Sequence, residues 1–208
     1  MREKVLGEVH ARPFRPLTGP RTVLHYAFLT NADEAAADQA WLSEFCVSRG
    51  APGPVSGARH HTLSFGGGSL SWEQHAEFTT YTWDGAARPD RIFGQIPEPH
   101  PFGAAFRAPG DLLVAVRLEL RDPVEGSGWR GHFDESSLTV STLEDDAAIA
   151  ATDFRQDGDG LTRILVFNRS LSDVQSGAVV QRLLEIETYR TLAMLGLFEA
   201  GGLQPEIR

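Results

Sequence analysis

The last long apolar segment of the chain repeats its hydrophobic residues at the spacing of an α-helix. From Ser170 onward it reads SLSDVQSGAVVQRLLEIETYRTLAMLGLF. At about 100° per residue, its apolar side chains fall within one broad arc. We therefore predict a helix over residues 171–199 whose buried face carries Val179, Val180, Leu183, Leu184, Ile186, Met194, Leu197 and Phe198.

Two charged residues, Glu187 and Arg190, lie in the middle of this apolar arc. Burying a lone charge costs several kcal/mol, so each of them should have a partner of opposite charge. We expect Arg190 to contact a carboxylate from another part of the fold, Glu77 or Asp153. By the same reasoning, we expect Glu187 to contact a cation such as Arg12 or Arg155.

The rest of the chain contains one further helix and several short alternating segments. Asn31, with Glu34 three residues later, is a capping box that begins a helix over residues 31–49. Alternation and β-forming residues predict eight strands. They lie at residues 22–30, 60–66, 69–74, 76–83, 111–120, 137–144, 147–156 and 162–169.

This order of elements predicts an α+β fold. Strands grouped with one helix per half favour mostly antiparallel sheets whose helices cover one face. We expect a single domain over residues 1–208, or two related-looking halves, 22–83 and 111–199, packed together. A connection rich in proline and glycine, residues 84–110, would join them.

Composition narrows the class of protein. Hydrophobic residues make up 41% of the 208 residues, enough for a folded core, and the formal net charge is -9. We therefore expect no nucleic-acid partner, because phosphate binding needs a clustered cationic surface. A single cysteine, Cys46, in an apolar helical pattern predicts a buried thiol in a reducing compartment. No apolar run is long enough for a secretory signal or a membrane span, so the chain is expected to be soluble and cytoplasmic.

Two glycine-rich motifs have both a functional and a structural interpretation. Gly66-Gly67-Gly68 could cradle a phosphate, but no P-loop lysine follows it. The DGDG of residues 157–160 resembles the start of a calcium loop, but the later carboxylates are missing. Both motifs are predicted to be hairpin turns.

Polar residues in four segments form the candidate site. Those near the N-terminus share one side of an extended chain because their spacing is two, and those at residues 73–77 do the same. A paired structural network is the favoured interpretation, followed by a small-ligand pocket on the same residues. A metal site or an acid–base enzyme are the further alternatives, and no cofactor is expected. The candidate residues are Glu8, His10, Arg12, Glu73, His75, Glu77, Asp153, Arg155, Glu187 and Arg190.

Four long segments carry a resemblance to a known family. They are GEVHARPF (7–14), SWEQHAEFTTYTW (71–83), ATDFRQDGDGLTRILVFNRSL (151–171) and QRLLEIETYRTLAMLGL (181–197). In these segments the chain resembles the DUF3422 proteins, a bacterial family of unknown function often described as membrane-anchored. The resemblance covers essentially all 208 residues but only the first half of a usual member. It implies a following helical stalk and hydrophobic anchor, which are not expected within these 208 residues.

The functional hypothesis joins these observations. We expect a non-enzymatic binding, sensing or interaction domain, which the resemblance places on the cytoplasmic face of the membrane in anchored family members. The alternative is an enzyme that uses acid–base or metal chemistry at the His/Glu/Arg cluster. The partner would be a small ligand or a protein. A homodimer is also expected, because the apolar arc of the last helix continues to its end.

Overall fold

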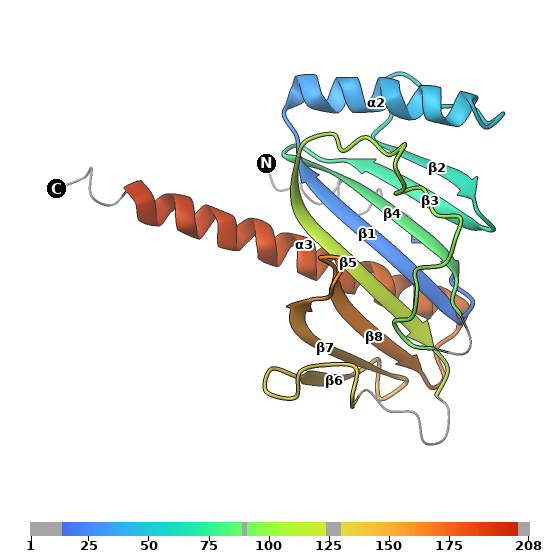
Figure 1. Ribbon diagram of the computed structural model, residues 1–208, viewed down its shortest axis with the longest axis vertical. Coiled ribbons are helices and arrows are strands. Elements are labelled where there is room, and N and C mark those ends of the chain that lie inside the picture. Colours follow the sequence, from blue (N-terminus) through green and yellow to red (C-terminus); the bar gives the residue numbers. More distant parts are fainter. Residues whose placement is uncertain (1–13, 89–90, 124–129, 204–208) are drawn as a thin grey trace.

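The computed structural model of the chain describes residues 14–88, 91–123 and 130–203 and confirms the α+β prediction. Eight strands form one sheet, accompanied by two helices (Figure 1). The elements are β1 (Arg21–Leu29), α2 (Ala32–Val47), β2 (His60–Phe65), β3 (Gly68–Gln74), β4 (Phe78–Ala86), β5 (Asp111–Arg121), β6 (Thr139–Leu143), β7 (Ala148–Gln156), β8 (Thr162–Asn168) and α3 (Asp173–Leu203).

The sheet has the strand order β2-β3-β4-β1-β5-β8-β7-β6. Every neighbouring pair is antiparallel except β5 and β8, which run parallel. The strands of residues 21–86 and 111–168 meet where β1 pairs with β5, so one sheet runs through both parts of the chain. The predicted hairpin turns at Gly66–Gly67 and at residues 157–160 connect β2 to β3 and β7 to β8.

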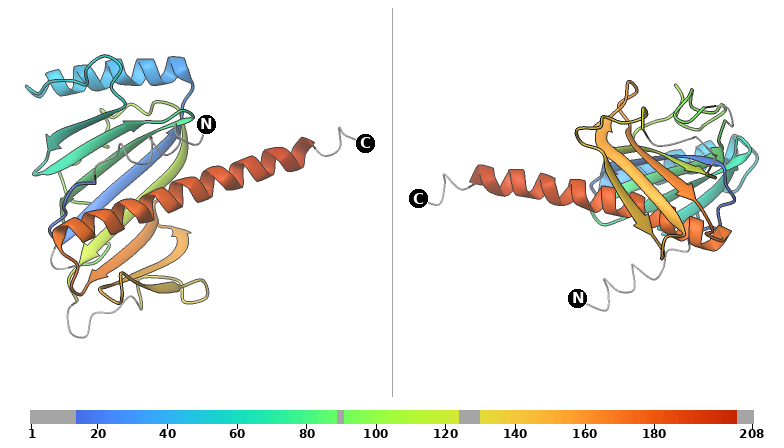
Figure 2. Two further views of the ribbon diagram at one scale, coloured as in Figure 1. Left: turned by 180° about the vertical axis from the view of Figure 1, so that it is seen from behind. Right: turned by 90° about the horizontal axis from the view of Figure 1, so that it is seen from below.

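The prediction that both helices cover one face of the sheet is wrong, because they lie on opposite faces (Figure 2). In β1, Val23 and Ala27 pack in the core beneath α3, whereas Leu24 and Phe28 pack with α2. A strand that is apolar on both faces is buried between two layers. The sign of this arrangement in the sequence was the apolar character of both alternating sets of positions in RTVLHYAFL.

Helix α2 is fixed to the sheet by a buried carboxylate. Its N-terminus is closed by the predicted Asn31–Glu34 capping box. One turn further on, Asp38 is only 4% exposed and accepts hydrogen bonds from Trp72 Nε1 and Tyr81 Oη, each at 2.7 Å. Burial raises the pKa of Asp38, although these two hydrogen bonds lower it. Cys46 is buried in the same core, as predicted.

The connection between β4 and β5 covers the rest of the α2 face and is held by a buried ionic triad. Glu119 on β5 is fully buried between Arg117 and Arg121, with N–O distances of 2.7 and 2.6 Å. The two guanidinium groups also donate to backbone carbonyls of the connection, those of Gly94, Arg88 and Arg91.

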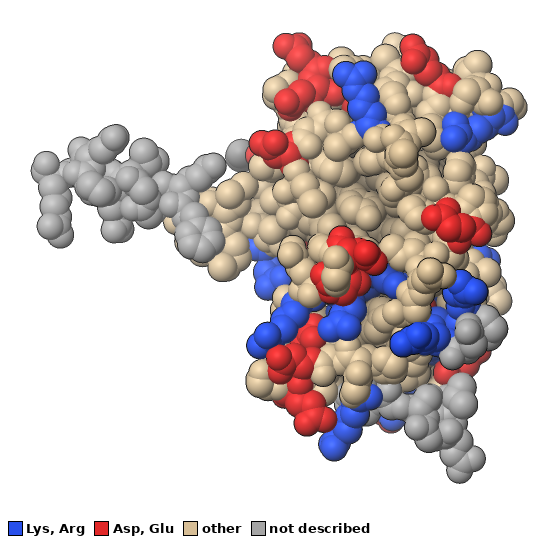
Figure 3. All heavy atoms as spheres, viewed as in Figure 1, with Lys and Arg blue, Asp and Glu red and all other residues tan. Residues whose placement is uncertain are grey.

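In the face shown in Figure 3, a broad uncharged area separates two zones where acidic and basic residues are mixed.

Helix α3 is buried along only part of its length. Val179, Val180 and Leu184 pack on the sheet as predicted, but Ile186 and Leu197 are 62% and 68% exposed. The predicted arc was therefore too wide, and the buried stripe runs through Gly177, Leu184 and Thr188 instead. Beyond about Ala193 the helix extends past the sheet as an overhang, residues 193–203 (Figure 1, Figure 2).

The strand β5 shows a second local difference. Strict two-residue alternation would place Leu112 on the same face as Val114, yet Leu112 is 58% exposed. The register of β5 against β1 shifts between Ala27 and Phe28, which turns Leu112 out of the core alternation.

Among the residues that the structure describes, neither helix offers a segment long and apolar enough to cross a bilayer.

Replacing Asp38 by alanine should strongly destabilise the fold. The substitution leaves two buried donors, Trp72 and Tyr81, without their acceptor, at about 1–3 kcal/mol for each orphaned group. We expect Asp38→Ala to lower the free energy of unfolding in urea by about 2–5 kcal/mol. Glu44→Ala, at an exposed position of the same helix, is the control and should stay near wild type. Equal stability of the two variants would contradict the role assigned to Asp38.

Candidate functional site

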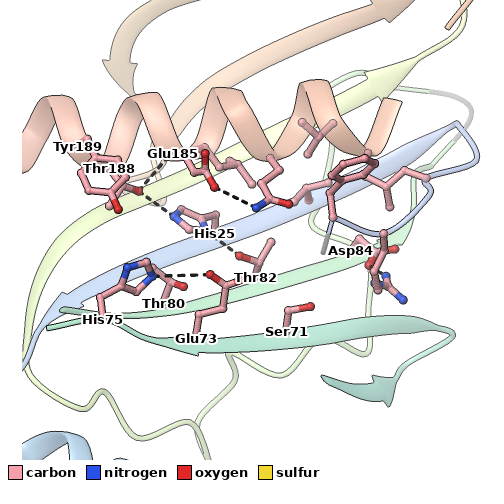
Figure 4. Close-up of a pocket in the computed structure, with 18 of the residues that line it drawn as sticks. His25, Ser71, Glu73, His75, Thr80, Thr82, Asp84, Glu185, Thr188 and Tyr189 are labelled. Carbon is pink, nitrogen blue, oxygen red and sulfur yellow. Dashed lines mark hydrogen bonds and ion pairs between the residues drawn. The ribbon is translucent and has the colours of Figure 1, made fainter. Parts of the chain in front are cut away.

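A pocket lies between α3, the sheet and the segment Phe14–Leu17 (Figure 4). Its empty volume is about 790 Å³, including the open mouth. Strands β1, β4 and β3 form its floor, and α3 forms one wall. The pocket exists because α3 lies over the centre of the sheet and leaves the outer strands of this face partly uncovered.

The alternation of β3 and β4 supplies the polar floor. On each strand, one set of side chains faces α2 and is mostly aromatic or aliphatic. The alternate set faces the pocket and is polar apart from Phe78. The apolar set is Leu70, Trp72, Tyr81 and Trp83. The polar set is Ser71, Glu73, Thr80, Thr82 and Asp84. Register pairs Ser71 with Thr82 and Glu73 with Thr80, so the polar side chains form neighbouring rows.

His25 joins this floor to the helix. Its Nδ1 lies 2.8 Å from the hydroxyl of Thr82 and its Nε2 lies 3.0 Å from the hydroxyl of Thr188 on α3. The Thr188 hydroxyl donates to the carbonyl of Leu184, so it accepts from His25 Nε2–H. Burial lowers the pKa of His25 to about 4, against an opposing effect of Glu73. His25 is therefore a neutral bridge between sheet and helix at pH 7.

Glu73 and His75 form a second polar group at the outer edge of the floor. His75 Nε2 lies 3.7 Å from Glu73 Oε2, and the imidazole stacks on the ring of Phe78 with 3.9 Å between centroids. Phe78 in turn meets Tyr189 of α3 edge to face at 5.9 Å. This end of the pocket therefore combines a carboxylate and an imidazole with two aromatic rings.

The opposite end is closed by an ion pair. Asp84 is bonded to Arg15, and Arg21 approaches its other oxygen at 3.8 Å. Burial raises the pKa of Asp84, and the two arginines act in the opposite direction. On the helix wall, Gln181 donates to Glu185 at 2.9 Å. Between these polar groups the lining is apolar, formed by Leu17, Val23, Phe78, Val180 and Leu184.

The lining suits a small amphipathic molecule. Apolar side chains fill the middle, and a few polar groups converge from both walls, which is the usual construction of a small-ligand site. Two of the polar groups, Glu73 and His75, belong to the set selected from the sequence. Glu8, His10 and Arg12, also in that set, lie outside the described residues. Glu77 is exposed in the turn between β3 and β4.

The structure separates the other candidates from this pocket. Asp153 is buried on β7, where it accepts from Asp134 N, Arg155 N and Arg163. The Arg155 side chain is exposed and pairs with Asp134 at 3.2 Å. A break in the β7–β8 register around Phe154 gives these neighbouring residues different surroundings. These residues therefore do not form one network with the pocket.

The expected contacts of Arg190 with Glu77 or Asp153 were wrong, and so was the expected contact of Glu187 with Arg155. The other expected partner of Glu187, Arg12, lies outside the described residues. Arg190 donates to Glu187 within the helix, at 2.6 and 3.2 Å, and lies over the ring of Phe154 at 4.9 Å. Glu187 is buried, but the Arg190 side chain is 46% exposed. Because its guanidinium remains in contact with water, Arg190 does not need a carboxylate from another element.

Several lining residues were missed in the sequence. Thr80, Thr82 and Asp84 have the same two-residue spacing that selected Glu73 and His75, so this signal was present in β4. Gln181 and Glu185 are one helical turn apart on α3. His25 had no such signal, because only the packing of α3 brings Thr188 to its ring.

The sequence was compared with known proteins. A family model described as "Protein of unknown function (DUF3422)" matches residues 1–208. No curated protein and no solved structure matches the chain.

The neutral His25 should make folding sensitive to mild acid. Its pKa is 6.5 in the unfolded chain and about 4 in the fold, so the unfolded state binds the proton first. The corresponding stability is fully present above pH 6.5 and is lost as the pH falls toward 4, by about 3 kcal/mol in total. We expect urea denaturation between pH 7 and 4 to show this loss in wild type and not in His25→Gln. His60→Gln, which removes an exposed histidine, should retain the wild-type slope. Parallel pH profiles for wild type and His25→Gln would refute the assignment.

Proposed function

Because the chain belongs to the DUF3422 family, whose function is unknown, we propose a function from its pocket: a non-enzymatic domain that binds a small molecule between α3 and the sheet. The observation that carries this proposal is the mixed lining of the pocket. A buried sheet face that served packing alone would be apolar, as it is under the centre of α3. Beside the helix it instead carries hydroxyl and carboxylate groups open to a pocket.

A second candidate function rests on the Glu73–His75 pair. A carboxylate beside an imidazole at one end of a pocket is the arrangement used for acid–base catalysis, so the alternative is an enzyme acting there. Binding is the preferred proposal because two of the pocket's other ionisable groups are engaged in the fold. His25 bridges two threonines, and Asp84 is held by Arg15.

We also propose that the domain works at the cytoplasmic face of a membrane in those family members that carry an anchor. The support is the family resemblance together with the free, buried thiol of Cys46, which is typical of a reducing compartment. This placement would let the pocket sample cytoplasmic small molecules.

Filling the pocket should abolish ligand binding. Gln181 lines the pocket from α3, so Gln181→Trp places an indole in the cavity. We expect N-phenyl-1-naphthylamine, a neutral apolar fluorescent probe, to bind wild type and to bind this variant at least about tenfold more weakly. Arg182→Trp is the matched control, because Arg182 points to Glu144 and its side chain is 66% exposed. Equal fluorescence titrations for all three proteins would count against the pocket as a binding site. Conversion of small-molecule metabolites by the purified protein would favour the enzyme.

We further propose that two copies associate through α3. The helix is about 46 Å long at 1.5 Å per residue, and its outer side carries exposed Ile186, Met194 and Leu197. Ile186 and Leu197 are eleven residues apart and thus lie on the same side of the helix. Pairing two α3 helices along this side would remove the apolar stripe from water.

The dimer proposal predicts a mass of twice 22.7 kDa by light scattering at high protein concentration. Leu197→Lys should shift the protein to the monomer mass, because it places a charge in the apolar contact. Val47→Lys, which changes an equally exposed apolar residue on α2, should leave the dimer intact. A monomeric wild type, or dissociation by both substitutions alike, would rule out this interface.

A further inference from the structure

The charges around the pocket are unequal. The carboxylates of Glu73, Asp84 and Glu185 line the pocket. In the part of the lining that the structure describes, Arg15 is the only arginine. Arg15 is already bonded to Asp84. The formal net charge of the chain is -9, which adds a long-range negative potential. The negative potential would therefore repel an anionic ligand and attract a cationic one.

Glu185 supplies an acceptor on the helix wall. It is half-buried, and its Oε1 accepts from Gln181 at 2.9 Å. Figure 4 shows its carboxylate pointing from α3 toward the strands of the floor. A carboxylate has about four acceptor positions, so one hydrogen bond from Gln181 leaves room for a further donor. A charged donor forms the strongest hydrogen bonds with such a group.

Thr80 supplies a polar group on the floor. The residue is only 6% exposed, and within residues 14–88, 91–123 and 130–203 its hydroxyl makes no hydrogen bond. A hydroxyl that lines a pocket and has no protein partner is available to a ligand group or an ordered water. Thr80 pairs in register with Glu73, so its hydroxyl lies beside a second carboxylate.

Aromatic and apolar groups complete the surroundings. The rings of Phe78 and Tyr189 meet edge to face at one end of the pocket, and aromatic faces attract cations. Val23, Val180 and Leu184 form an apolar stretch between this end and the Asp84–Arg15 pair. The polar acceptors and the apolar stretch are therefore neighbours in one cavity.

From this arrangement we propose that the pocket binds a small organic amine. The ammonium group would lie among Glu185, Thr80 and the Phe78–Tyr189 rings, and a short aliphatic body would lie along Val180 and Leu184. This inference rests on the proposed function and adds the chemical class of the ligand. It also gives a role to the Thr80 hydroxyl that lines the pocket, which would accept from the ammonium.

Three ligands of the same length and different head group test the proposal: hexylamine, hexanol and hexanoate, titrated calorimetrically at pH 7 and low salt. We expect hexylamine to bind at least about tenfold more tightly than hexanol, and hexanoate to bind most weakly. Glu185→Gln should weaken hexylamine about tenfold and leave hexanol unchanged. Glu44→Gln, the same charge change at an exposed site of α2, should affect none of the three.

The opposite results are equally informative. Hexanol or hexanoate binding as tightly as hexylamine would overturn the amine assignment, as would an unchanged amine affinity in Glu185→Gln. Because the ligand comparison in wild type needs no variant, a Glu185→Gln protein that fails to fold does not obstruct the test. If the naphthylamine probe binds wild type and Gln181→Trp blocks it, the pocket remains a binding site even when the amine preference fails. If neither the probe nor any of the three ligands binds, both proposals fail together.

Discussion

The fold depends on the buried charge of Glu119. This carboxylate lies where β1 and β5 pair, accepts from the hydroxyl of Thr22 across that pair, and is enclosed by the two arginines of its own strand. The remaining guanidinium donors hold the chain between β4 and β5 against the sheet. A buried triad of this kind is weak evidence for added stability, because desolvation offsets much of the attraction. Its effect is on geometry, since each donor and acceptor specifies where a strand or loop must lie.

Because the α2 face of the sheet is covered, a site can form only where the α3 face is polar and uncovered. The connection and α2 together cover the first face, and within residues 14–88, 91–123 and 130–203 no comparable segment accompanies α3 over β3 and β4. The residue types on this face of the strands change with the distance from α3. Beneath the helix the inward positions of β1 and β5 are Val23, Ala27, Val116 and Leu118, and beside it they become threonine, serine and acid. Packing and binding positions therefore meet on β1, within one sheet, because Val23 belongs to the core and also lines the pocket.

The elements themselves could be predicted from the sequence because their signals are local. Capping at Asn31, the turn at Gly66–Gly67 and the two-residue alternation each depend on a few neighbouring residues. The buried extent of α3 could not be predicted in this way. A helical projection identifies one apolar side, but it does not show where the sheet beneath it ends, so Ile186 and Leu197 were placed inside. For the same reason Arg190 was given a distant partner, although water and Glu187 satisfy it. His25 and Thr188, 163 residues apart, needed the tertiary arrangement.

A single continuous helix forms both the wall of the pocket and the overhang. Glu185 and Thr188 lie on one stretch of α3, and Leu197 follows about three turns later with no break in the helix between them. An α-helix is stiff along its axis. A contact that tilted the overhang would therefore also displace the Thr188 hydroxyl, which is hydrogen-bonded to His25. Linkage is reciprocal: if occupancy of the pocket favours one tilt of the helix, that tilt must in turn favour occupancy. One continuous helix therefore connects the wall of the pocket directly to the overhang.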